Sequence, residues 1–329
     1  GWLFSALGAI VIAKVFANFS KLIPASDGGP YAFTKAGLGD FAGFLVGWGY
    51  LISVWTTNAA IAVSLVSALS TFFPILAENS SIALATGLGF LWLLTWVNTM
   101  GVYASGRVIL MTTILKIVPL ILVAIGGLLF LDPQNLLPFN MSGTSSWQAI
   151  TATTTLTFFA FLGIECATIP SGSVTNSAAT VAKATTLGTL IATVVYILST
   201  VSIMGMIPAA QLKTSVTPFA DAAVLIWGHG AAYWVSAGVA IAAFGALNGY
   251  ILIQGQLPFA IAKDKLFPTV FMQLNSKGIP VLGVVISSVF VSVLMCMNYT
   301  KGLVDQFKFL MLMTTSTILI PYIFCTASY

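Results

Sequence analysis

The sequence predicts an all-α polytopic membrane helix bundle, and three observations lead to this fold class. Hydrophobic residues make up 58% of the 329 residues, whereas only 6% are charged. The mean hydropathy is +1.02, and soluble domains differ sharply in having about 25% charged residues. Apolar segments of about 20 residues, long enough to cross a bilayer, recur along the chain with short polar interruptions. We therefore expect an integral membrane protein.

Nine segments fit a membrane-spanning helix. They contain Gly, Ser, Thr and Ala among Leu, Ile and Phe, and they lack the ten-residue alternation of barrel strands, so packed helices are expected. The segments cover residues 2–22, 41–73, 81–102, 108–131, 147–170, 181–206, 231–261, 279–297 and 306–329.

Basic residues in the connections predict the orientation, because Lys and Arg concentrate on the cytoplasmic side of membrane proteins. Gly1 would then begin outside, as expected of a fragment that lacks a first helix. The net charge of +4 follows from the same bias and requires no nucleic acid partner. We expect a multi-pass protein of the plasma membrane, which is the inner membrane in bacteria. The predicted cytoplasmic set is Lys21, Lys35, Arg107, Lys183, Lys263, Lys265 and Lys277, and the opposite set is Lys213, Lys301 and Lys308.

Cysteine and histidine give no sign of a metal site or an enzyme. Cys166, Cys296 and Cys325 fall in apolar segments without a CxxC or Cys/His spacing. His229 lies in GHG between two segments, where a surface turn is expected. The sequence also lacks GxGxxG, GxxxxGKS, GxSxG and HExxH patterns. We expect no metal, no cofactor and no enzymatic activity.

One acid lies deep inside an apolar segment. Glu165 stands in FFAFLGIECAT, where a charge costs several kcal/mol unless it is paired, protonated or exposed to an aqueous cavity. Gly163 lies just before it, and Pro170, Ser171 and Gly172 follow closely, so the helix is expected to unwind. Unwound backbone at membrane depth is typical of transporter substrate sites. The alternative is a buried hydrogen bond by which Glu165 ties two helices together.

Lys116, in ILKIVPL, is the second charge well inside a segment. It could extend its ammonium group to the cytoplasmic surface. Alternatively, it could be a buried ammonium that gains and loses protons. The sequence leaves both interpretations open.

Longer stretches resemble a known family. GGPYAFTKAGLGDFAGF, residues 28–44, resembles the entry into the third helix of the amino acid, polyamine and organocation permeases, within them the basic amino acid and polyamine antiporters. YILSTVSIMGMIP and PFADAA are similar to the family's seventh helix and the loop after it. GQLPFAIAKDKLFPTVF and GIPVLG are similar to the end of the eighth helix and the start of the ninth. The resemblance covers essentially the whole chain.

This resemblance implies a LeuT-type inverted repeat, in which two groups of five helices are related by a pseudo-twofold axis in the membrane plane. Residues 1–329 would form a single transmembrane transporter domain. It would be a fragment with family helices two to ten, lacking the first helix and the C-terminal helices. The segment of Glu165 would be the sixth helix, which is broken in the family.

The resemblance also implies roles for ten residues. Tyr50 and Asn58 are eight positions apart, so that one helical face could present both. Phe159 and Tyr250 stand where arginine-exchanging members have tryptophan, and Ala160 replaces a serine. The implied substrate-binding residues are Tyr50, Asn58, Phe159, Ala160, Leu162, Gly163 and Tyr250, and those for gating or proton coupling are Glu165, Lys116 and Tyr322.

The function expected from these observations is secondary active amino acid transport by alternating access, as an amino acid/polyamine antiporter. Lys116 resembles the fifth-helix lysine of proton-coupled relatives, so a proton-coupled amino acid symporter of broad or neutral specificity is the alternative. A structural or receptor-like membrane protein is the alternative outside transport. Expected partners are a small-molecule amino acid or polyamine, protons, the lipid bilayer and a second copy in a homodimer.

Overall fold

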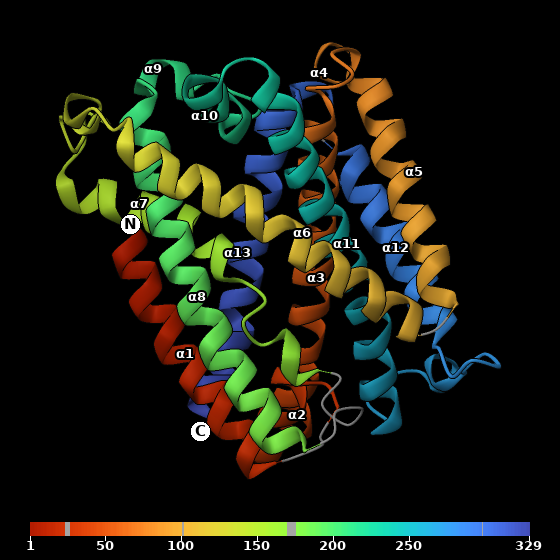
Figure 1. The fold of residues 1–329 in the computed structure, drawn as a ribbon. Helices are drawn as coiled ribbons and strands as arrows, with labels where there is room; N and C mark the ends of the chain where they lie inside the picture. The colour runs from red at the N-terminus through yellow and green to blue at the C-terminus, as the bar shows by residue number, and fades with distance from the viewer. Residues whose placement is uncertain (24–26, 101, 170–175, 298) are drawn as a thin grey trace.

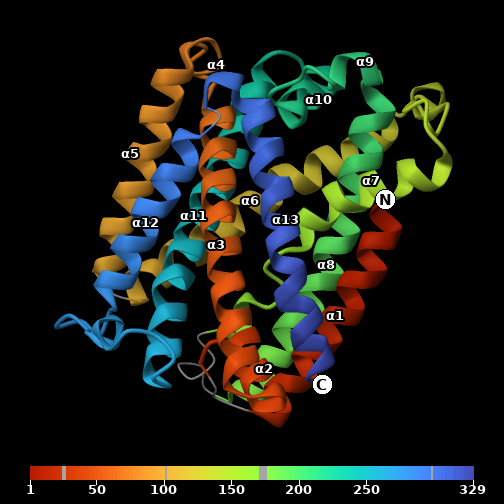
Figure 2. The same cartoon turned by 180° about the vertical axis from the view of Figure 1, so that it is seen from behind.

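The structure is a computed structural model that describes residues 1–329 except 24–26, 101, 170–175 and 298. Within α6 it does not describe the side chains of residues 102–110, 113–114 and 116–117. The described residues form helices, turns and loops without a strand, and most of the long helices run side by side, whereas α6 crosses them obliquely (Figures 1 and 2). The predicted all-α fold class is confirmed.

Each of the nine predicted segments contains a helix. Seven of the described helical spans are long and apolar enough to cross a membrane, whereas α12 and the described apolar part of α6 are shorter. The fifth segment is interrupted: its helix, α7, is followed by two 3₁₀ turns. The bounds are α1 (Trp2–Leu22), α3 (Asp40–Leu69), α5 (Ser80–Thr99), α6 (Val102–Leu129), α7 (Ser146–Phe158) with η2 (Phe159–Phe161) and η3 (Cys166–Thr168), α8 (Ser177–Met206), α11 (Gly230–Lys263), α12 (Val281–Cys296) and α13 (Leu303–Ala327).

Short helices that the sequence did not predict connect the long ones. Two of the short α-helices, α2 and α10, begin with proline at a first-turn position, where its missing N–H costs nothing. The same two end at glycines with positive φ, Gly39 and Gly228, which stop an α-helix. The short elements are α2 (Pro30–Leu38), α4 (Ile75–Glu78), α9 (Ala209–Leu212), α10 (Pro218–Trp227), η1 (Pro133–Leu136), η5 (Thr269–Met272) and η6 (Tyr299–Lys301).

These short helices mark the two ends of the bundle. α2 lies at one end, where α11 also finishes, and α4, α9 and α10 lie at the other (Figure 1). Most lysines of the predicted cytoplasmic set belong to the α2 end. We refer below to the α2 end and the α10 end.

Helix α3 runs through the middle of the bundle and packs on both α11 and α13 (Figures 1 and 2). Its buried side includes Tyr50, Leu51 and Val54, and further along it carries the small residues Ala59 and Ala60. Small residues let neighbouring helix backbones approach closely within a membrane. On one flank α1 lies against α8, and on the other α5 lies against α12.

Candidate functional site

The segment after α7 leaves the α-helical path in the middle of the bundle. Leu162 has an extended ψ of 139°, and Gly163 has a φ of +100°. Residues with a side chain rarely adopt that φ. A Cβ atom at Gly163 would also lie 2.5 Å from the hydroxyl of Tyr250. The break expected from the sequence is therefore present between Phe159 and Thr168.

Pro170, Ser171 and Gly172, which contributed to that expectation, lie outside the residues that the structure describes. The described break depends instead on Gly163 and on the two 3₁₀ turns, η2 and η3, on either side of it.

Glu165 sits in this break and is held by two tyrosines from other helices. Its residue surface is only 1% exposed. Tyr50 of α3 donates a hydrogen bond of 2.5 Å to Oε1, and Tyr322 of α13 donates one to Oε2. A carboxylate accepts hydrogen bonds at both oxygens, so this arrangement compensates part of the cost of burying it. One side chain thus joins the broken segment, α3 and α13.

Exposure to an aqueous cavity, one of the three ways in which a charge can lie at this depth, is not found for Glu165. A cavity of about 240 Å³ does adjoin the break, between it and α8, and the predicted residues Ala160, Leu162 and Gly163 line it. Glu165 is not among its lining residues, and its carboxylate accepts hydrogen bonds from the two tyrosine hydroxyls. This packing agrees with a closed gate and equally with the helix tie that the sequence left open.

Asn58 points to a different part of the bundle from Tyr50. It is fully buried and donates a 2.7 Å hydrogen bond to Oε1 of Gln254 on α11. Gln254 donates a 2.8 Å bond to Ser288 of α12, and Ser288 shares a 2.7 Å bond with Thr95 of α5.

Tyr50 and Asn58, which the sequence could place on one helical face, therefore have different hydrogen-bond partners. At about 100° per residue, eight residues turn a helix about 80° beyond two full turns, which directs the two side chains to different neighbours. The buried polar chain from Asn58 to Thr95 was missed. The signal available in the sequence was a polar residue at each of these positions within four apolar segments.

The other implied residues lie as follows. The hydroxyl of Tyr250, on α11, approaches Gly163 at the break. Lys116 lies on α6, but its side chain is outside the described residues. In the described part of the chain, no three His, Cys, Asp or Glu side chains gather in a metal-binding arrangement.

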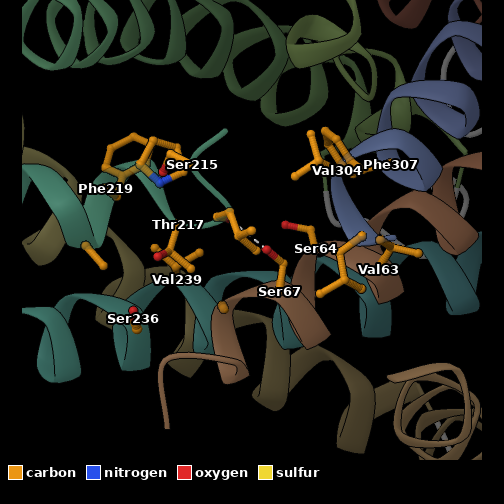
Figure 3. Close-up of a pocket in the computed structure, with 15 residues that line it drawn as sticks. Val63, Ser64, Ser67, Ser215, Thr217, Phe219, Ser236, Val239, Val304 and Phe307 are labelled. Atoms are coloured by element: carbon orange, nitrogen blue, oxygen red, sulfur yellow. Dashed lines mark hydrogen bonds between the residues drawn. The ribbon is translucent and has the colours of Figure 1, made fainter. Parts of the chain in front are cut away.

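A larger cavity, of about 390 Å³, opens at the α10 end between α3, α10, α11 and α13 (Figure 3). Hydroxyl groups lie among its apolar walls, and Ser67 donates a 2.8 Å hydrogen bond to the carbonyl of Val216. Phe307 lines this cavity, and its ring packs edge-on against that of Phe159 at a centroid distance of 5.8 Å. The Phe159–Phe307 pair thus lies between the cavity and the broken segment. Labelled lining residues in Figure 3 include Val63, Ser64, Ser215, Thr217, Phe219, Ser236, Val239 and Val304.

Charged and polar side chains join the elements at the α2 end. Tyr31 donates a 2.7 Å hydrogen bond to Oδ2 of Asp264, and the Nζ of Lys35 lies 2.8 Å from the same oxygen. Lys35 also lies 3.7 Å from Asp40. These contacts attach α2 to the end of α11 and to the start of α3.

The pKa values of this cluster follow from burial and hydrogen bonding. Burial raises the pKa of Tyr31, and its hydrogen bond to Asp264 acts in the same direction. Burial alone would raise the pKa of Asp264, but hydrogen bonds from Lys35 and Tyr31 outweigh it and hold that pKa below its ordinary value. Asp264 is therefore a carboxylate at neutral pH.

Comparisons with known proteins agree with this architecture. The family model described as "Amino acid permease" matches residues 1–329. The chain is 34% identical to the cadaverine/lysine antiporter of Escherichia coli K12 over 90% of its own length, and it spans 66% of the length of that relative. It is 32% identical to the arginine/ornithine antiporter of Pseudomonas aeruginosa, with 100% of this chain and 70% of the relative covered. It is 30% identical to a putrescine transporter of Haemophilus influenzae, with 99% and 75% covered.

The helical spans and these bacterial relatives together identify a multi-pass integral protein of the inner membrane. The match to the family model extends over the entire sequence, including the broken segment around Glu165. The chain belongs to the amino acid permease family.

Proposed function

We propose that the protein is a secondary transporter that exchanges amino acids and polyamines by alternating access, with residues 1–329 in one transport domain. The observation that carries the proposal is the break at Gly163, with Glu165 held between Tyr50 and Tyr322. The names of the relatives support the substrate class, since they are antiporters for cadaverine and lysine or for arginine and ornithine, and a transporter for putrescine.

The proposed route begins at the α10 end, in the cavity that Phe307 lines. From there a substrate would pass the Phe159–Phe307 ring pair and reach the unwound backbone. In a continuous α-helix the peptide N–H and C=O groups form hydrogen bonds with one another. At the break, such groups are available to the amino and carboxylate groups of the substrate. Phe159 and Tyr250 would cover the substrate side chain, and their rings can attract its ammonium group.

The proposed gating step is a change in the partners of Glu165. A substrate shifts a conformational equilibrium only if it interacts differently with the two states. A cationic group of the substrate near the break would compete with Tyr50 and Tyr322 for the carboxylate of Glu165. Binding of the substrate would then be linked to release of the two tyrosines from Glu165. Proton uptake by Glu165 would act on the same two hydrogen bonds. The contacts of Asp264 with Tyr31 and Lys35 would keep the α2 end closed in the conformation described here.

Exchange and proton symport are separated by uptake into liposomes that contain the full-length protein. Labelled lysine, ornithine and putrescine are offered outside, and the liposomes hold either the same compounds or buffer alone. If the protein is an exchanger, uptake of the labelled compound should depend on substrate inside the liposomes and should occur without an imposed proton gradient. Uptake into buffer-filled liposomes, driven by a proton gradient alone, would contradict exchange and indicate symport. The absence of uptake under all conditions would contradict transport of these substrates.

A further inference from the structure

A basic groove lies on the outer surface of the bundle between α1 and α8, towards the α2 end. It has a volume of about 520 Å³. Lys14 and Lys21 of α1 and Lys183 of α8 line it, together with Asn18 and small alanine side chains. The ion pairs between described side chains involve Lys35 and Lys263, so none of them neutralises the three lysines of the groove.

The three lysines share one surface because of their spacing. Lys14, Asn18 and Lys21 are four and three residues apart, which aligns them on one face of α1. Ala17 of α1 and Ala182 of α8 form part of the groove wall and leave room between the lysine stems. The groove is therefore concave, positively charged and closed on two sides by helices.

An exposed apolar surface continues from this groove towards the middle of the bundle. On α1 the same three- and four-residue spacing continues through Val11, Leu7 and Phe4, which are 55% to 65% exposed. The two helices run in opposite directions side by side (Figures 1 and 2). On α8 the exposed apolar residues that continue the three- and four-residue spacing from Lys183 are Leu187, Ile191 and Val194.

We propose that this groove binds the phosphate group of an anionic phospholipid in the cytoplasmic leaflet, with the acyl chains along the apolar surface. The α2 end is the cytoplasmic end by the distribution of lysine and arginine. Basic pockets between membrane helices on that side suit anionic lipid head groups. Lys14 lies about 10 Å further from the helix end than Lys21. Its long stem can carry the ammonium group outward to the same phosphate.

The test measures which lipids stay bound to the full-length protein in detergent. The protein is incubated with phosphatidylglycerol and phosphatidylcholine of identical acyl chains, and bound lipid is counted by native mass spectrometry. The groove variant combines Lys21→Gln with Lys183→Gln. The matched control combines Lys265→Gln with Lys277→Gln, which removes two exposed lysines from the same end of the protein.

Wild type and the control pair should both prefer phosphatidylglycerol. The preference of the groove pair should fall by at least about fivefold, the effect of one lysine near a membrane surface. Lys21→Arg with Lys183→Arg should retain it, because the charge is preserved. An unchanged preference in the groove pair, or an equal loss in the groove and control pairs, would overturn the proposal.

Two further measurements on wild type keep the proposal testable if the groove pair does not fold. Salt should reduce the preference for phosphatidylglycerol, because exposed charges are screened. A preference that is insensitive to salt would overturn the proposal. Glycerol phosphate, which has no acyl chains, should not displace the bound lipid at concentrations similar to those of the lipid. Full displacement would indicate a site for soluble phosphate and not for lipid.

Discussion

The hydroxyl of Tyr50 donates a 2.5 Å hydrogen bond to Oε1 of Glu165. Tyr322 donates to the other carboxylate oxygen, so α3, α13 and the broken segment meet at one side chain. Because the three partners belong to three different segments, a relative movement of any one of them must break at least one of these hydrogen bonds. This geometry is the basis of the gating role that we propose for Glu165.

Removing either hydroxyl should destabilise the described conformation. We expect Tyr322→Phe and Tyr50→Phe each to lower the free energy of unfolding by about 1.5–3 kcal/mol, the range for hydrogen bonds to charged groups. Thermal unfolding in detergent measures the change. Tyr233→Phe is the control, because Tyr233 is 55% exposed. If Tyr322→Phe is as stable as this control, the hydrogen bond to Glu165 contributes nothing to the fold.

A side chain at Gly163 should disrupt the break. Gly163→Ala combines an unfavourable φ of +100° with a Cβ atom only 2.5 Å from the hydroxyl of Tyr250. We expect a loss of more than about 1 kcal/mol in stability and a large loss of exchange. Gly8→Ala is the matched control, because a Cβ there meets no atom within 4 Å. It should be neutral or slightly stabilising. Equal effects of the two substitutions would argue against a strained break.

The Phe159–Phe307 ring pair, between the cavity at the α10 end and the break, should affect substrate entry. Phe307→Ala removes the ring that contacts Phe159 at 5.8 Å. Such ring pairs contribute about 0.5–1.5 kcal/mol beyond burial, so the substrate concentration for half-maximal exchange should rise by up to about tenfold. Phe139→Ala is the control, because Phe139 is 91% exposed. A normal concentration dependence in Phe307→Ala would exclude this ring pair from the entry route.

Asp264, at the α2 end, should make the stability of the folded protein depend on pH. Its pKa is lower in the folded protein than the ordinary 3.8, so its contribution is complete above that value and is lost as pH falls through the lowered pKa. Asp264→Asn should therefore be less stable than wild type near neutral pH. The difference should be below about 1 kcal/mol, because the side chain is 41% exposed.

Unfolding curves of wild type and Asp264→Asn over a range of pH test this sign. The two proteins should converge in acid, where the wild-type carboxylate is also neutral. A difference that grows as the pH falls would contradict the stabilising role of the contacts from Lys35 and Tyr31.

The long helices were predictable because hydrocarbon selects apolar segments of nearly constant length. The break was predictable because Gly163 and a lone acid stand together in such a segment. The short helices α2 and α10 were missed because nine or ten residues are too few to span a bilayer, and composition alone does not reveal them.

The partners of the predicted residues were not predictable from local sequence. Glu165 is 115 residues from Tyr50 and 157 from Tyr322, and Asn58 is 196 from Gln254. Such pairs depend on how the helices pack and rotate. Tyr50 and Asn58 differ by about 80° of rotation about the axis of α3. Tyr50 contacts Glu165, whereas Asn58 contacts the polar side chains of α11 and α12.

The rate of exchange as a function of pH, in wild type and in Glu165→Gln, tests the gating role most directly. Glutamine keeps the shape of the side chain but cannot ionise, and it weakens the hydrogen bonds from Tyr50 and Tyr322. We predict a rate at least about tenfold lower, consistent with the loss of one hydrogen bond to a charged group. We also predict that the pH dependence of the wild type disappears. A variant with the rate and the pH profile of the wild type would show that Glu165 only ties helices together.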